Sequence, residues 1–395
     1  MTQAEAFRID VSERALLDLR DRLARTRWPD EVADAGWDYG VPLSFLKDLV
    51  TYWQERFDWR STEQTLNSFH HFRARIEGLE VHFVHERGRG PEPMPLILTH
   101  GWPGSFLELL PLVPLLTDPA SQGGSSEDAF DVVIPSLPGY GFSERPPRRG
   151  MLSARIASMW NGLMTDVLGY ESYGAHGGDI GSRVTTRLGQ HHADRVVGIH
   201  ITAVEDPPLG PDSPPLTQAE SEFRRLRDAW YEAEGGYSHI QRTKPQTLAY
   251  GLSDSPAGLA AWILEKYRTW SDCAGDVERR FGRDWLLTAA TLYWVTETIP
   301  SSMRLYFERR RDLEPFAAGE RIAAPAGVSL FPNELVAESH PPREWVERLY
   351  DLRHFARMPR GGHFPALEEP ALLADELRSF FRPLRARPAY SARTV

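Results

Sequence analysis

The chain has 395 residues, of which 41% are hydrophobic and 25% charged, a composition typical of a soluble globular protein with a large core. A net charge of −10 argues against nucleic acid as the main partner, because phosphate binding needs a basic surface. The single cysteine, Cys273, excludes an intrachain disulfide, and the lack of a signal-peptide pattern or an apolar run of ~18 residues predicts a cytoplasmic chain with no membrane partner.

Helices and irregular segments are predicted for residues 1 to about 75. A helix begins at Ser12, because leucines follow it at helical spacing, and a second helix covers about 43–57. The segment between them is rich in Trp, Pro and Gly and is too small and open to form a core alone. We therefore assign 1–78 to an N-terminal arm that packs on a larger body, either within the same chain or across a homodimer.

A β-sheet is predicted after the arm. The run 79–85 alternates between apolar and polar residues, which predicts a half-buried strand near a sheet edge. Continuous apolar runs predict buried strands at 95–100, 132–135 and 196–201, and a helix is predicted at about 154–168. Because strands and helices alternate, we expect right-handed βαβ units and a mostly parallel sheet.

The pattern changes between 206 and 320, where helical patterns replace the strand signals. Ser255 followed by Pro256 starts one of these helices, as an N-cap and a proline at the first helical position. We interpret 206–320 as a helical cap that is inserted over the sheet.

Strand and helix signals resume after the cap. Strands are predicted at 326–331 and 352–356, and a final helix starts near Pro370. The sheet-forming core is therefore expected to consist of two segments, 79–205 and 321–395.

The segment YGAHGGDIGS at 173–182 has the pattern of a strand, a sharp turn flanked by glycines, and a helix, with Asp179 at the turn. This is the pattern of a nucleophile elbow, where small neighbours are needed because the nucleophile lies in a strained turn. A carboxylate at that position indicates an ester formed by attack on an electrophilic carbon. Because Asp between glycines is also common in ordinary turns, the motif alone leaves both interpretations open.

A second motif, HGWPGS at 100–105, follows a predicted buried strand, which is where an oxyanion loop belongs. The backbone N–H groups of Trp102 and Ile180, the residue after the candidate nucleophile, would point at the same oxygen. The alternative for this motif is an ordinary strand-to-helix turn.

A base and an acid follow in chain order. His363 comes after the last predicted strand and before the last helix, so it can reach the edge of the sheet where the elbow lies. Glu334 follows the penultimate strand and is the candidate acid that orients His363, although Glu338 lies nearby. The order of nucleophile, acid and histidine is that of α/β-hydrolases.

Taken together, the chain resembles an epoxide hydrolase of the microsomal type, within the α/β-hydrolase superfamily. The resemblance covers nearly the whole chain and rests on motifs in the correct order: WP at 28–29, HGWPGS at 100–105, PGYGFS at 138–143, GDIG at 178–181, FPNE at 331–334 and RGGHF at 360–364. It implies an α/β-hydrolase fold with a mostly parallel sheet, a helical cap and an N-terminal extension. It also implies that two cap tyrosines, at the positions of Tyr237 and Tyr306, donate hydrogen bonds to the epoxide oxygen. The chain departs from the microsomal enzymes in having no N-terminal membrane anchor, which predicts a soluble enzyme.

The reaction implied by the resemblance is the conversion of an epoxide and water to a vicinal diol, with no cofactor and no metal. Asp179 would form an alkyl ester, and His363, oriented by Glu334, would activate the water that hydrolyses it. The long, aromatic cap favours a bulky apolar or aryl epoxide, for detoxification or for natural-product biosynthesis.

Two other functions compete with this interpretation. Haloalkane dehalogenases also use an Asp nucleophile, a His base and an acid that orients the His, but Ile180 has no side-chain donor for a leaving halide. A non-catalytic ligand-binding protein on the same fold is the other alternative, although a binder does not need a nucleophile, a base and an acid together.

Overall fold

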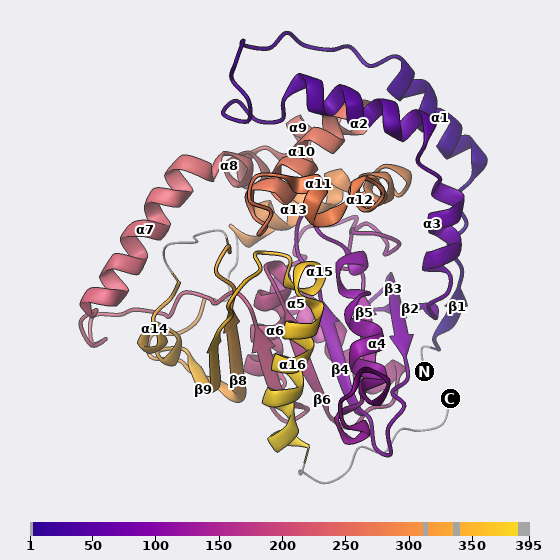
Figure 1. Cartoon of the computed structure of the whole chain (residues 1–395). Helices are drawn as coiled ribbons and strands as arrows, with labels where there is room; N and C mark the ends of the chain where they lie inside the picture. The colour runs from indigo at the N-terminus through magenta and orange to yellow at the C-terminus, as the bar shows by residue number, and fades with distance from the viewer. Residues whose placement is uncertain (1–2, 311–314, 335–339, 386–395) are drawn as a thin grey trace.

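The computed structural model describes residues 3–310, 315–334 and 340–385. Within these ranges, nine strands form one sheet in the order β1-β2-β3-β5-β4-β6-β7-β8-β9 (Figure 1). The strands are β1 (Glu5–Phe7), β2 (His71–Ile76), β3 (Leu79–Glu86), β4 (Met94–Thr99), β5 (Phe130–Pro135), β6 (Tyr173–Gly177), β7 (Val196–Ile201), β8 (Ile322–Leu330) and β9 (Tyr350–Arg357). The six strands from β5 to β9 in this order are parallel neighbours, so the prediction of a mostly parallel sheet is confirmed.

Helices cover the two faces of the sheet and one end of its parallel strands (Figure 1). The core helices are α4 (Leu112–Thr117), α5 (Ser153–Gly162), α6 (Ile180–His191), α14 (Arg343–Glu347), α15 (Pro365–Glu368) and α16 (Pro370–Phe381). The cap helices are α7 (Gln218–Glu234), α8 (Gly236–Thr243), α9 (Pro245–Asp254), α10 (Pro256–Thr269), α11 (Val277–Phe281), α12 (Arg283–Val295) and α13 (Ile299–Arg309). No helix in the described part of the chain is long and apolar enough to span a membrane.

The parallel strands β4, β5, β6 and β7 are buried along their whole length, which explains why they are largely apolar. Successive side chains of a strand point to opposite faces. In β4, accordingly, Ile97 belongs to the hydrophobic cluster that includes α5 and α6, whereas Leu96 and Leu98 belong to the cluster that includes α4 and α16. The sheet is therefore the middle layer of three, and the helices packed on its two faces fix the positions of its strand ends.

The helical segment predicted between the two parts of the core is present, and it lies over the ends of the parallel strands (Figure 1). Its α10 starts as predicted, with the Ser255 side chain accepting a hydrogen bond of 3.0 Å from the Gly258 N–H and Pro256 in the first turn.

The prediction of only helical and irregular structure up to about residue 75 is wrong. Helices α1 (Glu13–Ala24), α2 (Leu43–Glu55) and α3 (Trp59–Leu66) are present, but β1 and β2 add two strands to the sheet. As a result, β3 is third from the edge of the sheet, and not near it as predicted. The β2–β3 hairpin turns at Glu77 and Gly78, whose φ angles are +47° and +85°, values typical of a two-residue turn.

The N-terminal helices also contact the cap, as the prediction of an arm on a larger body requires. Trp53 of α2 is buried and donates a hydrogen bond of 3.0 Å to the Thr291 hydroxyl of α12. Arg22 of α1 forms an ion pair of 2.7 Å with Asp254 at the end of α9. Helices α1 and α2 thus lie over the cap, while β1 and β2 extend the sheet (Figure 1).

Candidate active site

Asp179 lies between the end of β6 and the start of α6, with φ +49° and ψ −120°. A positive φ is strained for a residue with a side chain, and such strain is found mainly at functional sites. The turn is possible because its neighbours have no side chain: a Cβ on Gly181 would lie 1.9 Å from the Thr99 carbonyl oxygen, and one on Gly177 would lie 2.2 Å from Gly181. The segment therefore has the geometry of a nucleophile elbow.

The HGWPGS loop passes directly beside this carboxylate. The Trp102 N–H donates a hydrogen bond of 2.8 Å to Asp179 Oδ1. A Cβ on Gly101 would lie 2.4 Å from the Asp179 side chain, so only glycine lets the loop come so close. Ile180 is the first residue of α6, and its N–H belongs to the first turn, where helical N–H groups have no partner within the helix. The two predicted oxyanion donors thus adjoin the same carboxylate.

His363 lies in the loop between β9 and α15, and its imidazole bridges two carboxylates. Its Nδ1 is 2.5 Å from Glu334 Oε1, and its Nε2 is 3.9 Å from Asp179 Oδ2. The loops that carry the two residues are joined because the Asn333 N–H donates a hydrogen bond of 3.0 Å to the Gly361 carbonyl. Glu334 therefore lies where an orienting acid must lie, whereas Glu338 falls outside the described residues.

The charges around His363 determine its protonation state. Burial disfavours the imidazolium, but the Glu334 carboxylate and then the Asp179 carboxylate outweigh it and raise the pKa of His363 to about 9. At neutral pH, with Asp179 ionised, His363 is therefore charged. A change in the charge of Asp179 must change the pKa of His363 as well.

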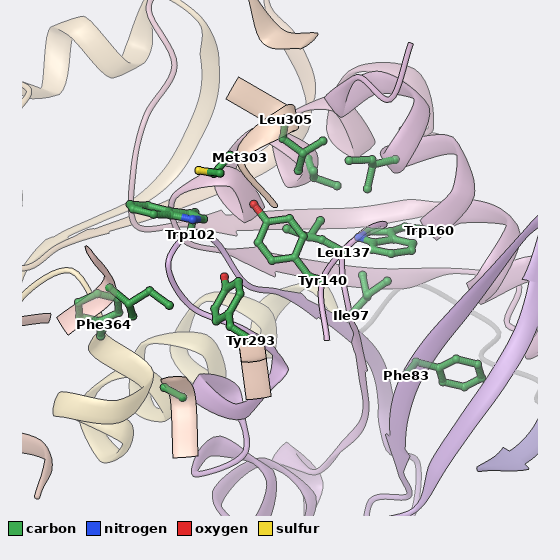
Figure 2. Packing of buried hydrophobic residues seen from close by; sticks show 14 of the residues in the cluster. Phe83, Ile97, Trp102, Leu137, Tyr140, Trp160, Tyr293, Met303, Leu305 and Phe364 are labelled. Carbon is green, nitrogen blue, oxygen red and sulfur yellow. The ribbon is translucent and has the colours of Figure 1, made fainter. Parts of the chain in front are cut away.

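Tyr237 lies on α8 and Tyr306 on α13 of the cap. Both rings contact Trp102 of the oxyanion loop, which lies beside Asp179. The Tyr237 ring stacks on Trp102 at 5.3 Å and 7°, and the Tyr306 ring meets Trp102 edge-on at 5.8 Å. Figure 2 shows the buried side chains around Trp102, from Met303 and Leu305 of α13 to Phe364 of the core. The two tyrosine rings meet edge-on, with centroids 6.1 Å apart.

Both phenols are held in their neutral form. Burial, and after it the Asp179 charge, raise the pKa of Tyr237 well above its usual value. Burial, and then the neighbouring Tyr237 and Asp179, do the same to the pKa of Tyr306. Two neutral O–H donors are thus available on the cap side of the nucleophile.

A small cavity of about 20 Å³ lies beside Asp179, and its described lining belongs to the core. The carboxyl of Glu108 lines this cavity together with Asp179 and His363. The sequence analysis did not single out Glu108. The available signal was a glutamate within the otherwise apolar run FLELL at 106–110, immediately after the oxyanion loop.

All seven residues that the sequence predicts for the site thus come together at the end of the parallel strands. The fold and the elbow define the class of the protein, an α/β hydrolase. The family model described as "alpha/beta hydrolase fold" matches residues 94–234, and the model described as "Epoxide hydrolase N terminus" matches residues 4–109.

The similarity to known proteins extends over almost the whole chain. A protein of Stigmatella aurantiaca is 45% identical over 96% of this chain and 85% of its own length, and epoxide hydrolase 1 of Sus scrofa is 38% identical over 95% and 87%. The solved structure of Aspergillus niger epoxide hydrolase has a TM-score of 0.82 and 32% identity over 96% of both chains. The crystal structure of juvenile hormone epoxide hydrolase from Bombyx mori has a TM-score of 0.82 and 31% identity, over 98% of this chain and 95% of that one. The chain belongs to the epoxide hydrolase family.

Proposed function

We propose that the chain hydrolyses epoxides to vicinal diols through a covalent ester on Asp179. The observation that carries this proposal is the position of the Asp179 carboxylate. Its Oδ1 accepts a hydrogen bond from the Trp102 N–H, and its Oδ2 lies 3.9 Å from the Nε2 of His363. One carboxylate therefore adjoins both an oxyanion donor and a base, as a nucleophile that forms and then loses an ester requires.

In the first step, Asp179 Oδ2 attacks one ring carbon and breaks the bond between that carbon and the epoxide oxygen. The Tyr237 and Tyr306 hydroxyls donate hydrogen bonds to this oxygen and stabilise the developing alkoxide. The alkoxide gains a proton from a tyrosine hydroxyl, and the imidazolium of His363 returns one. The ester form then contains a neutral His363, which is the form that can act as a base.

In the second step, the ester is hydrolysed. Esterification removes the Asp179 charge, and with it one of the contributions that raise the pKa of His363. Neutral His363, oriented by Glu334, takes one proton from water, and the hydroxide attacks the ester carbonyl.

The oxyanion that forms is stabilised by the Trp102 and Ile180 N–H groups, each donor contributing about 2.7–4 kcal/mol in comparable sites. The bond between the carbonyl carbon and the alkyl oxygen then breaks. The proton of the added hydroxyl passes to the departing oxygen, which yields the diol and restores the Asp179 carboxylate and the charged His363.

The substrate class that we propose is a bulky apolar or aryl epoxide. The rings of Trp102, Tyr237, Trp270 and Tyr306 contact one another around the cap side of the nucleophile, with centroid separations from 5.0 to 6.1 Å. Aromatic walls with a few polar groups are typical of sites that bind apolar ligands.

Two variants test the proposed route with styrene oxide as the substrate. Asp179→Ala is expected to abolish turnover, because no ester can form. His363→Gln is expected to form the ester without hydrolysing it, so that the intact protein gains the mass of one substrate molecule on the Asp179 peptide. His70→Gln is the matched control, since its imidazole is 73% exposed and lies outside the site. Turnover by His363→Gln at the wild-type rate would contradict the assignment of the base.

A further inference from the structure

Glu108 is a carboxyl group beside the nucleophile that the two-step route does not use. It lies in the 3-10 helix η1 (Phe106–Leu109), which follows the oxyanion loop. Its side chain lines the same cavity as Asp179 and His363. A carboxyl group among buried apolar neighbours is costly unless it has a partner, so its presence here needs an explanation.

The cavity is lined by residues of the core. Its described lining comes from the oxyanion loop, η1, the elbow with the end of β6, the residue after β7, the segment that follows β9, and α16, and it includes neither Tyr237 nor Tyr306. With about 20 Å³ it is large enough for about one water molecule. Since the epoxide oxygen binds at the tyrosines, this core side is where the hydrolytic water can reach the ester carbonyl and His363.

The loop is shaped to admit the Glu108 carboxyl. A Cβ on Gly104 would lie 1.7 Å from Glu108 Oε2, so any side chain at that position would displace the carboxylate. The Gly104 carbonyl is itself held by a hydrogen bond of 2.8 Å from the Tyr293 hydroxyl. On the other side, the Gly101 N–H donates a long hydrogen bond of 3.4 Å to Glu108 Oε1. Glu108 Oε1 thus accepts one long hydrogen bond, and a carboxyl oxygen has the capacity to accept a second.

We propose that Glu108 binds the hydrolytic water, accepting one of its hydrogens while His363 Nε2 accepts the other. This inference rests on the proposed function, because it assigns a residue to the second step of that route. With two acceptors on its hydrogens, the water oxygen is directed at the ester carbonyl of Asp179. Glu108 acts on hydrolysis of the ester and not on its formation.

The charges of the site also act on Glu108. Burial raises the pKa of Glu108 to about 8, the His363 charge opposes that shift, and the Asp179 charge adds to it. Because the first step neutralises both Asp179 and His363, these two opposing effects are lost together, and either a carboxylate or the carbonyl oxygen of a neutral acid can accept a hydrogen from water. The other titratable groups near Glu108 are the buried phenols of Tyr140, Tyr267 and Tyr293, whose pKa values are raised well above the usual value, so they stay neutral.

The test is a single-turnover experiment that measures the two steps separately in Glu108→Gln and Glu108→Ala. With enzyme in excess over styrene oxide, quenched-flow mass spectrometry follows the ester as it forms and decays. We expect ester formation to stay within about 3-fold of wild type, while ester decay slows by about 10- to 100-fold, the loss expected when one partner of a buried hydrogen bond is removed. The ester should consequently accumulate during steady-state turnover.

Glu63→Gln is the matched control, because Glu63 is a buried glutamate outside the cavity, hydrogen-bonded to the Val11 N–H at 2.7 Å. Equal slowing of both steps in the Glu108 variants would overturn the inference, since it would indicate a distorted oxyanion loop. Unchanged ester decay in Glu108→Ala would overturn it too. If Glu108→Gln fails to fold, Glu108→Asp provides the test, with slower decay of the ester expected from a carboxylate that is one methylene too short.

The same experiment separates this inference from the proposed function. If His363→Gln forms no ester, the covalent route itself is wrong. If His363→Gln accumulates ester and the Glu108 variants hydrolyse it at the wild-type rate, the route stands and only the role of Glu108 is wrong.

Discussion

The Asp179 carboxylate influences three titratable groups that the proposed route uses. Its charge raises the pKa of His363 on one side and of Tyr237 and Tyr306 on the other. The resting site therefore holds a charged imidazole and two neutral phenols. Loss of the Asp179 charge on esterification shifts the imidazole towards its basic form, so that one covalent event prepares the next.

This coupling predicts a pH dependence of stability. The folded-state pKa of His363, about 9, exceeds the ordinary value of 6.5, so the folded protein binds its proton more tightly than the unfolded chain does. The resulting stabilisation is fully present below pH 6.5 and is lost as the pH rises through about 9. Urea denaturation across this range should show the free energy of unfolding of the wild-type protein falling.

The His363→Gln variant isolates the contribution of this histidine. The raised pKa of Glu108, about 8, shifts stability in the same direction as the pH rises from 4.5 to about 8, and this contribution is present in the variant too, where the His363 charge no longer opposes it. A smaller loss of stability in His363→Gln than in wild type is the expected result, and an equal loss in both proteins would contradict the coupling.

The tyrosine assignment makes a prediction about the first step. Removing one hydroxyl, in Tyr237→Phe or Tyr306→Phe, should slow ester formation by about 10²- to 10³-fold, because each hydroxyl stabilises the developing alkoxide. Stopped-flow single-turnover rates measure this step. The control is Tyr250→Phe, in the same cap but with its side chain exposed on α9. Near wild-type rates in both site variants would remove the tyrosines from the mechanism.

A site residue could be predicted from the sequence where a local motif surrounds it. Asp179, Trp102 and His363 could be predicted because glycine-rich turns mark them. Tyr237 and Tyr306 came from the family resemblance alone, since nothing local distinguishes them among 13 tyrosines. Glu108 was missed because its contact with Asp179 and His363 depends on how η1 packs against the loop that follows β9.

Among the elements, the elbow between β6 and α6 is the most constrained. The Gly181→Ala variant places a methyl group 1.9 Å from the Thr99 carbonyl, so either the elbow or β4 must move. We expect it to destabilise the fold by about 1–3 kcal/mol, as overpacking does, and to reduce turnover because Asp179 shifts with it. Thermal denaturation and styrene oxide turnover measure the two effects.

Gly251→Ala is the matched control for that prediction. Gly251 lies inside α9, and an added Cβ would meet nothing within 4 Å. Alanine there should stabilise the helix by about 0.5–1 kcal/mol and leave turnover unchanged. If both alanine variants behaved alike, close packing at the elbow would not explain why glycine is needed there.

Element prediction succeeded where the periodicity was strong and failed where pairing was decided by distant partners. The buried parallel strands and the α10 start were predicted from apolar runs and an N-cap. Strand β1 has only three residues, too few for a pattern, and it forms because β2 offers it an antiparallel partner. The strand β2 does alternate, with Phe72, Ala74 and Ile76 on one face, and Glu77-Gly78 gives the turn signal, so this hairpin could have been predicted.

In the whole molecule, the sheet and the cap each supply one part of the site. The sheet places the elbow, the oxyanion loop and the His363 loop at one end of its strands, and the cap lies over that end (Figure 1). Helices α8 and α13 of the cap carry the two tyrosines. The arm contributes no proposed site residue but contacts the cap through Trp53 and Arg22. These contacts attach the arm to the cap, and sequence patterns alone cannot show them because they join residues more than 200 positions apart.

The covalent route is tested most directly by a single turnover in ¹⁸O-labelled water, with wild-type enzyme in excess over styrene oxide and mass spectrometry of both the protein and the diol. The account predicts label in the Asp179 peptide and an unlabelled diol, because the diol takes its second oxygen from the carboxylate and water replaces that oxygen. Label in the diol with none in the protein would mean that water attacks the epoxide directly, which would contradict the assignment of Asp179 as the nucleophile.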